Sequence, residues 1–264
     1  MGDWLLNLPV MWMALVIFAG TYTIAAIVYL VVTRLAVDER YDAFKSLSPG
    51  MLPSLALIFG LLVGFIASQV WSEFEKAKVA VVTEASGLRS VVLLSESFPD
   101  EKERIRSLLS QHIDDAVNEE WPEMSRQRAT LTRLPVKLIE AMQTTLALKP
   151  VDEGQKTAQR EMIGALENAF EARRQRILIS QSSVSKIKWA GLLLQALCTL
   201  VAIAMVHVDH RGACAIGLAL FATGVAMSIL LIGCYSRPFT GEISIGPELL
   251  QQAITSDAEP GVND

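Results

Sequence analysis

The stretch PGMLPSLALIFGLLVGFIASQVW, residues 49–71, contains no Asp, Glu, Lys or Arg. Three other long runs share this property, namely residues 10–32, 189–208 and 213–235. A helix needs about 20 apolar residues to cross the hydrocarbon layer of a membrane, and each run has that length. The sequence therefore predicts four transmembrane helices, in one hairpin within residues 1–71 and a second within residues 189–235.

The charged residues gather between the two hairpins. Residues 72–188 hold 18 of the 23 Lys and Arg and 18 of the 28 Asp and Glu. This block is therefore a solvated domain, large enough to bury a modest core. The acidic tail, residues 236–264, has five acids against Arg237 and supplies most of the net charge of −5. No basic patch is present, so we expect no nucleic-acid partner.

Four crossings place both termini and the block 72–188 on the same side of the membrane. Nine Lys and Arg near the membrane boundaries belong to that side, against four in the short links, residues 33–48 and 209–212. Positive charges favour the cytoplasmic side, so we expect the termini and the block in the cytoplasm. The first run is longer than a signal-peptide core and should remain as an anchor.

Helical spacing continues beyond the second crossing. Phe74, Val81 and Leu88 recur every seven residues between residues 72 and 94, which predicts that this crossing leaves the bilayer as one long helix. Residues 152–189 contain no Pro and predict a second long helix, continuous with the third crossing, with Asp152 as its N-cap.

Two shorter helices are expected between these long ones. The first begins at Phe98-Pro99-Asp100 and ends at Trp121-Pro122, and the second runs from Pro135 to Lys149-Pro150. No strand pattern is present in the block, and only residues 241–245 have the composition of a short extended stretch. The predicted fold class is all-α, with a helical cytoplasmic domain between membrane helices 2 and 3 and continuous with both.

The second crossing has two contrasting faces. Small residues recur at every fourth position and predict a face that another helix can approach closely, formed by Ala56, Gly60, Gly64, Ser68 and Ser72. Bulky residues form a second stripe, and Phe59, Leu62 and Ile66 are its candidates for a hydrophobic pore neck. The other interpretation of this stripe is contact with lipid or with the other three crossings.

Glu84 lies on the apolar stripe of the predicted long helix, where a carboxylate must find a partner. One interpretation pairs it with an arginine of the returning helix, for which three are available, Arg173, Arg174 and Arg176. The other interpretation places Glu84 in a polar ring along an ion path.

Catalytic and metal-binding patterns are scarce in this chain. No Walker, Rossmann or nucleophile-elbow pattern occurs, and no crossing carries a charge, which argues against a proton pump. His207, His210 and Cys214 are residue types that bind zinc or copper, but they surround a short link between two crossings, where polar residues mark the interface. We therefore expect no metal, no cofactor and no enzymatic activity.

Three segments are distinctive when taken together, SQVWSEFEKAKVAVVTEASGLRSVVLLS (68–95), VNEEWPEM (117–124) and SRPFTGEISIGP (236–247). They resemble the bestrophin-like domain family of bacterial membrane proteins, and the similarity covers most of residues 45–250. The matching positions are Trp71, Glu84, Ala85, Leu88, Glu120, Trp121, Pro122, Arg237, Pro238, Phe239 and Gly241. Family members often have Asp before Arg-Pro-Phe, whereas this chain has Ser236.

The resemblance implies an architecture related to bestrophins, which are pentameric anion channels whose second crossing lines the pore. The leading hypothesis is thus a homo-oligomeric ring in the bacterial inner membrane that conducts anions. The alternative is a membrane-anchored scaffold or sensor whose helical domain binds a cytoplasmic partner. In either case Arg237 can bond lipid phosphate or a carboxylate such as Glu84, and Pro238 ends the fourth helix.

Overall fold

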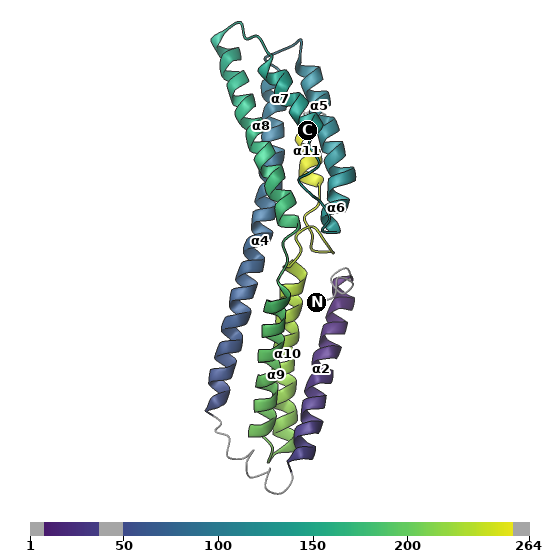
Figure 1. Ribbon diagram of the computed structural model, residues 1–264, viewed down its shortest axis with the longest axis vertical. Coiled ribbons are helices and arrows are strands. Elements are labelled where there is room, and N and C mark those ends of the chain that lie inside the picture. The colour runs from purple at the N-terminus through teal and green to yellow at the C-terminus, as the bar shows by residue number, and fades with distance from the viewer. Residues whose placement is uncertain (1–7, 37–49, 256–264) are drawn as a thin grey trace, which may run out of the picture. The chain divides into compact units, whose positions relative to one another are not determined.

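The computed structural model describes residues 8–36 and 50–255, and within these ranges the chain is helical, with no strand. The helices are α2 (Val10–Leu35), α4 (Met51–Ser95), α5 (Lys102–Asp115), a π-helix (Ala116–Glu120), α6 (Trp121–Ser125), α7 (Val136–Leu146), α8 (Glu153–Ser180), α9 (Lys186–Val206), α10 (Arg211–Tyr235) and α11 (Glu248–Thr255) (Figure 1). Four of them, α2, α4, α9 and α10, are long and apolar enough to cross a membrane. The all-α fold class with a 2+2 arrangement of crossings is confirmed.

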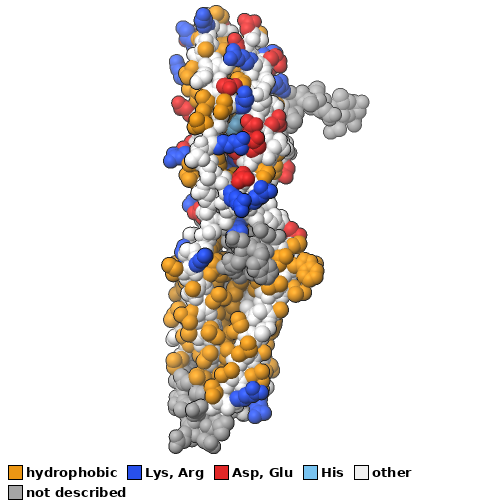
Figure 2. All heavy atoms as spheres, turned by 45° about the vertical axis from the view of Figure 1, so that its right-hand side comes forward, with side chains coloured by type: hydrophobic (Ala, Val, Ile, Leu, Met, Phe, Trp, Pro, Cys, Tyr) orange, Lys and Arg blue, Asp and Glu red, His pale blue; other side chains and the backbone are white. Residues whose placement is uncertain are grey.

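The chain divides into two compact units. The first, here called the membrane unit, comprises the residues up to Ser72, residues Ser183–Arg237 and residues Gly241–Ile243. The second, the inserted unit, comprises Glu73–Ser182, Pro238–Thr240 and the residues from Ser244 onward. On the face drawn in Figure 2, hydrophobic side chains gather over the membrane unit, and most of the Lys, Arg, Asp and Glu side chains gather over the inserted unit.

In the membrane unit, α2, α9 and α10 lie side by side (Figure 1). The buried residues of α2 recur every three or four positions, as in Met13, Ile17 and Thr21, so a single face of the helix contacts its neighbours. Ala204 and Ala222 are fully buried between the helices. Small side chains let the backbones approach closely, which matters inside lipid because the hydrophobic effect does not drive helices together there.

In the inserted unit, the later part of α4 packs with α5, α7 and α8 around one apolar core. Val81 and Leu88, spaced seven residues apart as predicted, are both fully buried in it. The prediction that α4 continues past the second crossing as one helix agrees with its 45 residues. Asp152 caps α8 as expected, its Oδ1 accepting a hydrogen bond from the backbone N–H of Gln155 at 2.7 Å.

The structure differs from the prediction at the return path to the membrane. Instead of one helix over residues 152–189, α8 ends at Ser180 and α9 begins at Lys186, with a turn and four non-helical residues between them. The serines explain the break. The hydroxyl of Ser182 donates to the carbonyl of Ile179 at 2.7 Å, and Ser185 caps α9 by accepting from the N–H of Lys188. The inserted helices are thus continuous with membrane helix 2 but not with helix 3.

Two further details differ from the sequence reading. Pro122 was expected to end a helix, but it lies in the first turn of α6, which follows a π-helix directly. Proline has no N–H to donate in the α-helical register, so widening the helix just before it costs fewer hydrogen bonds.

Residues 241–245 form bends rather than a strand, with Gly241 at a φ of 90°, a conformation that favours glycine. Three predicted parts of the chain lie outside the described residues: the N-terminal seven residues, most of the first link (37–49) and the end of the acidic tail (256–264).

Gly87 on α4 offers a test of this packing. A Cβ atom at Gly87 would lie 2.8 Å from the carbonyl oxygen of Ala165 on α8, so Gly87→Ala forces the two helices apart. At Gly164, also in a helix of this unit, an added Cβ meets nothing within 4 Å. We expect Gly87→Ala to lower the melting temperature of the purified protein. Gly164→Ala should leave it unchanged or raise it, since Ala favours helix by about 1 kcal/mol over Gly. Equal effects of both substitutions would contradict the close approach.

Candidate functional site

A cluster of charged side chains lies buried at the centre of the inserted unit. Glu84 comes from α4, His112 from α5, Glu120 from the π-helix, and Arg173 and Arg176 from α8. Glu84 and Arg176 have no exposed surface. Segments separated by as many as 92 positions in the sequence thus meet in one ionic cluster.

The contacts in the cluster satisfy nearly every charged atom. Arg176 Nε donates to Glu84 Oε2 at 2.7 Å, and its Nη2 donates both to Glu84 Oε1 at 3.1 Å and to Glu120 Oε2 at 2.9 Å. Arg173 donates from Nε and Nη2 to Glu120 Oε1, at 2.8 and 2.6 Å. His112 Nε2 lies 3.3 Å from Glu84 Oε1. The prediction that an arginine of the returning helix pairs with Glu84 is confirmed, with Arg176 as the partner.

The electrostatic balance of the cluster favours ionised carboxylates. Burial by itself raises the pKa of the Glu84 carboxyl, but the charge of Arg176 and the hydrogen bonds from His112 and Arg176 outweigh it and lower the pKa to about 2. Burial acts in the same upward sense on Glu120, whose pKa is nevertheless lowered by Arg176 and Arg173. Both carboxylates are therefore charged at neutral pH, matching the two guanidinium groups.

Aromatic residues close the cluster on one side. The guanidinium carbon of Arg176 lies 4.4 Å from the centroid of the Trp121 ring. The indole N–H of Trp121 donates to the carbonyl of Ile245 at 3.1 Å, and its ring meets Phe239 edge-on at 6.0 Å. Four of the family-motif positions, Glu84, Glu120, Trp121 and Phe239, are thus brought to one place, with Ala85 and Leu88 buried in the same unit.

The remaining motif residues lie elsewhere. Pro122 is in the first turn of α6, and Pro238 is buried. Trp71 is exposed in the membrane unit, with its ring 5.2 Å from that of Tyr235. Arg237 is the last residue of the second hairpin of the membrane unit.

The sequence did not place two members in this cluster, His112 and Glu120, although Glu120 is one of the family-motif positions. His112 lies on the same helix face as Ile105, Leu109 and Ile113, and a histidine on such an apolar face is itself a signal of a buried partner. Glu120 stands next to Glu119, but Glu119 is exposed and pairs with Arg133, while the Glu120 side chain is only 10% exposed. Nothing in the local sequence distinguishes these two carboxylates.

A pore neck requires exposed side chains, but the neck candidates on α4 are buried or half-buried. Phe59 and Ile66 are only 8% and 4% exposed and belong to the core of the membrane unit, where the Phe59 ring lies 5.3 Å from Phe221 of α10. Leu62 is half-buried against the same core. This stripe therefore holds α4 against the other crossings of its own chain, as the second interpretation had it.

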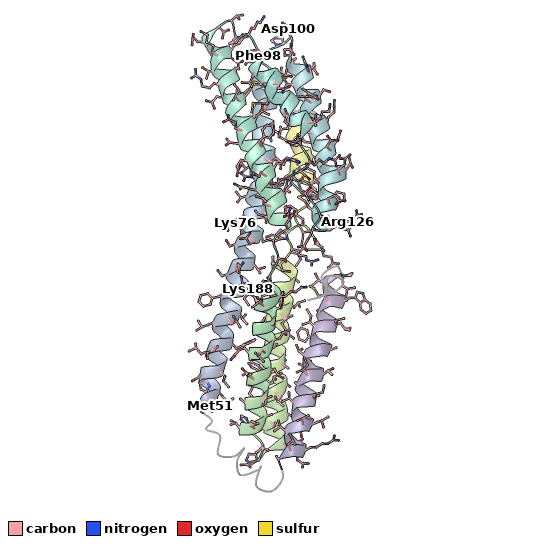
Figure 3. All side chains as sticks on the ribbon, viewed as in Figure 1. Met51, Lys76, Phe98, Asp100, Arg126 and Lys188 are labelled. Carbon is pink, nitrogen blue, oxygen red and sulfur yellow. The ribbon has the colours of Figure 1, made fainter. Side chains whose placement is uncertain are left out.

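The small-residue face of α4 is exposed in the part of the chain that the structure describes. Ala56, Gly60, Gly64 and Ser68 are all exposed, and an added Cβ at Gly60 or Gly64 would meet nothing within 4 Å. Beside it runs an apolar stripe at four-residue spacing, Leu57, Leu61 and Phe65, which are 64%, 52% and 73% exposed. In Figure 3 the side chains on one side of α4, above Met51, project away from the other membrane helices. Within residues 8–36 and 50–255, this face of α4 is therefore not covered by another helix.

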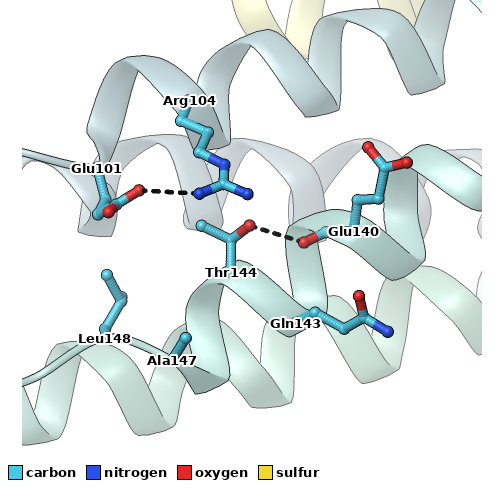
Figure 4. Close-up of a pocket in the computed structure, with 7 residues that line it drawn as sticks. All are labelled: Glu101, Arg104, Glu140, Gln143, Thr144, Ala147 and Leu148. Atoms are coloured by element: carbon cyan, nitrogen blue, oxygen red, sulfur yellow. Dashed lines mark hydrogen bonds and ion pairs between the residues drawn. The ribbon is translucent and has the colours of Figure 1, made fainter.

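The histidine link and the cavities of the inserted unit show no catalytic arrangement. His207 Nδ1 lies 3.0 Å from the carbonyl of Ile203, and within residues 8–36 and 50–255 no three His, Cys, Asp or Glu side chains could hold a metal ion together. A cavity of about 230 Å³ between α5 and α7 is lined by Glu101, Arg104, Glu140, Gln143, Thr144, Ala147 and Leu148 (Figure 4). Its Glu101 and Arg104 pair with each other at 3.9 Å.

Replacing Glu84 with glutamine tests the cluster. Glu84→Gln leaves Arg176 buried beside a neutral amide, and loss of one partner of a buried pair costs about 3–5 kcal/mol. We expect a large fall in melting temperature at pH 7. Glu73→Gln is the matched control, because Glu73 pairs only with Lys76 on the exposed helix surface and should have little effect. A Glu84→Gln protein as stable as the control would contradict the assigned role.

The same pair predicts a pH dependence. The pKa of Glu84 is lowered to about 2 from 4.5, so its stabilising effect is fully present above pH 4.5 and is lost as the pH falls towards 2. The difference in melting temperature between wild type and Glu84→Gln should stay constant from pH 7 to about pH 5 and then shrink. A difference that remains unchanged down to pH 3 would show that the carboxylate is not the stabilising group.

Comparison with known proteins agrees with this architecture. The family model of the bestrophin-like domain matches residues 19–250. No curated protein matches the chain. Among solved structures, a variant of a bacterial bestrophin homologue from Klebsiella pneumoniae superposes with a TM-score of 0.72 at 12% identity, covering 93% of this chain and 99% of that one. A second variant of that homologue gives 0.68 at 13% identity, covering 92% and 96%. The chain therefore belongs to the bestrophin-like domain family.

Proposed function

We propose that this protein forms a homo-oligomeric ring in the bacterial inner membrane and conducts anions through a pore lined by α4. The observation that supports this most directly is the open face of α4, which is apolar and small and stays exposed among residues 8–36 and 50–255. A transmembrane face of this kind fits a place where copies of one helix surround an axis. Anion permeability comes from the family resemblance, which implies bestrophin-like conduction, and a ring of five follows from the same source.

The neck of the proposed pore is assigned to Leu57, Leu61 and Phe65. They recur every fourth residue, so they follow one gently inclined line along α4. At about 100° per residue, Leu61 lies roughly opposite Phe59 around the helix axis. A ring of such side chains would gate by dewetting, since water leaves a narrow apolar constriction readily. This assignment replaces Phe59 and Ile66, whose side chains are occupied in the core of the membrane unit.

The block of residues 72–188, most of which belongs to the inserted unit, would serve as the cytoplasmic part of the channel, with both termini on the same side. The Lys and Arg count near the boundaries supports this orientation. Glu84 is then a structural residue of that part rather than a ligand for passing ions, because it has no exposed surface. The segments 1–71 and 189–235 are the two membrane hairpins, and residues 236–264 form the acidic tail.

Recordings from purified protein in planar bilayers test the proposal. We expect single-channel currents whose reversal potential in a chloride gradient follows the chloride equilibrium potential. Phe65→Ala and Leu61→Ala should each raise the unitary conductance about twofold or more, because they widen the constriction. Ile66→Val is the matched control, since it trims a buried side chain of α4 and should leave unitary conductance unchanged.

Three results would contradict the proposal. Absence of current from a protein shown to be a ring would exclude conduction and favour the membrane-anchored scaffold or sensor. A dimer would exclude the central pore. A rise in conductance for Ile66→Val without one for Phe65→Ala would restore the opposite face of α4 as the neck.

A further inference from the structure

An apolar groove opens between α2, α9 and α10 in the membrane unit. Its volume is about 330 Å³. All three helices contribute to its lining, including Thr21 and Ile24 of α2, Leu193 and Leu197 of α9, and Ala222 of α10. The groove exists because small side chains form its floor. Ala196 and Ala222 are buried there, and neither is large enough to fill the space between the helices.

The chemistry of the lining restricts what the groove can hold. Thr21 carries the hydroxyl group of the lining, and that group already donates to backbone carbonyls of its own helix, with Ile17 at 2.9 Å and Phe18 at 3.0 Å. The other lining side chains are Leu, Ile, Val and Ala. A polar ligand would find no partner here, so the occupant must be apolar. Ile24, Leu193 and Leu197 are exposed at the rim, so the groove opens to the surroundings of the membrane helices.

A positive charge lies on the same line of α9 as the groove. Leu193 and Leu197 follow Lys186 by seven and eleven residues, which places each leucine within about 20° of Lys186 around the helix axis. Along the axis the two leucines lie about 10 and 16 Å from Lys186. Lys186 is exposed at the first turn of α9, where the helix dipole adds partial positive charge. The neighbouring Lys188 is bonded to Gln69 of α4.

We propose that this groove is a binding site for an anionic phospholipid, with one acyl chain between α2, α9 and α10 and the phosphate at Lys186. The two parts of the site match the two parts of such a molecule in both chemistry and order. The apolar groove lies deep in the crossing, and the ammonium group lies at its end. The proposal depends on the crossings being in a bilayer and not on ion conduction.

Photo-crosslinking in lipid nanodiscs tests the site. The probe is phosphatidylglycerol with a diazirine on one acyl chain, and a phosphatidylcholine with the same chain is the comparison lipid. Mass spectrometry of the full-length protein should find adducts concentrated on residues 193–200 and 21–25. Unlabelled phosphatidylglycerol should compete them away at least about tenfold more effectively than phosphatidylcholine, because only the former carries net charge to Lys186.

Two pairs of variants sharpen the test. Lys186→Glu should reduce the adducts at residues 193–200 about fivefold or more, whereas Arg211→Glu, a charge reversal at the start of α10, should not. Ala196→Leu fills the floor of the groove and should also abolish them, with Ala215→Leu on the exposed surface of α10 as its control. Lys186→Glu changes only an exposed side chain, so it remains informative if Ala196→Leu does not fold.

Several outcomes would overturn the proposal. Adducts spread evenly over all exposed faces of the crossings would show ordinary surrounding lipid. Equal competition by both lipids, or no effect of Lys186→Glu, would remove the headgroup site. Formation of a disulfide between subunits carrying Leu194→Cys, together with a lack of adducts, would show that a second copy of the chain occupies the groove.

Discussion

The ion pair between Glu84 and Arg176 constrains the packing of the whole inserted unit. Both side chains are removed from water, and burying two charges costs several kcal/mol per ion unless every hydrogen bond is satisfied. The guanidinium meets this demand with two carboxylates, the sulfur of Met124 and the face of Trp121. Those partners come from α4, the π-helix and α6, so their helices must take one particular arrangement around α8. His112 adds α5 to the same set.

The π-helix has a clear place in this arrangement. It precedes Trp121 directly and ends at Glu120, the carboxylate that joins Arg173 and Arg176. A π-helical turn shifts the helix face by the width of one residue, so the residues after it project in a different direction from those of a regular α-helix. The Glu120 side chain is only 10% exposed, while Glu119 remains at the surface with Arg133. Helix α5 keeps its apolar face towards the core throughout.

The membrane unit depends on fit between apolar surfaces rather than on charge. Lipid is as apolar as leucine, so contact between crossings is favoured only where shapes match, as at the buried alanines of α9 and α10. Two surfaces that lack such a match among residues 8–36 and 50–255 carry the proposals made above. One is the open face of α4, which we assign to copies of the chain around a pore. The other is the groove at Leu193 and Leu197, which we assign to lipid. The two surfaces differ in shape, because the groove is a hollow of about 330 Å³ between three helices, whereas the face of α4 belongs to one helix.

The amino-acid sequence by itself determined the four crossings, the all-α class and the need for a partner at Glu84. The reason is that absence of charge over some 20 residues and a carboxylate on an apolar stripe are local features with direct energetic consequences. The sequence did not decide which arginine pairs with Glu84, or that His112 and Glu120 join this pair. These contacts link segments that are far apart in the chain. The sequence likewise did not decide which face of α4 is buried. In a membrane crossing both the buried and the exposed faces are apolar, so hydropathy cannot separate them. Only the packing of α4 against its neighbours turned Phe59 and Ile66 inward and left Leu57, Leu61 and Phe65 outside.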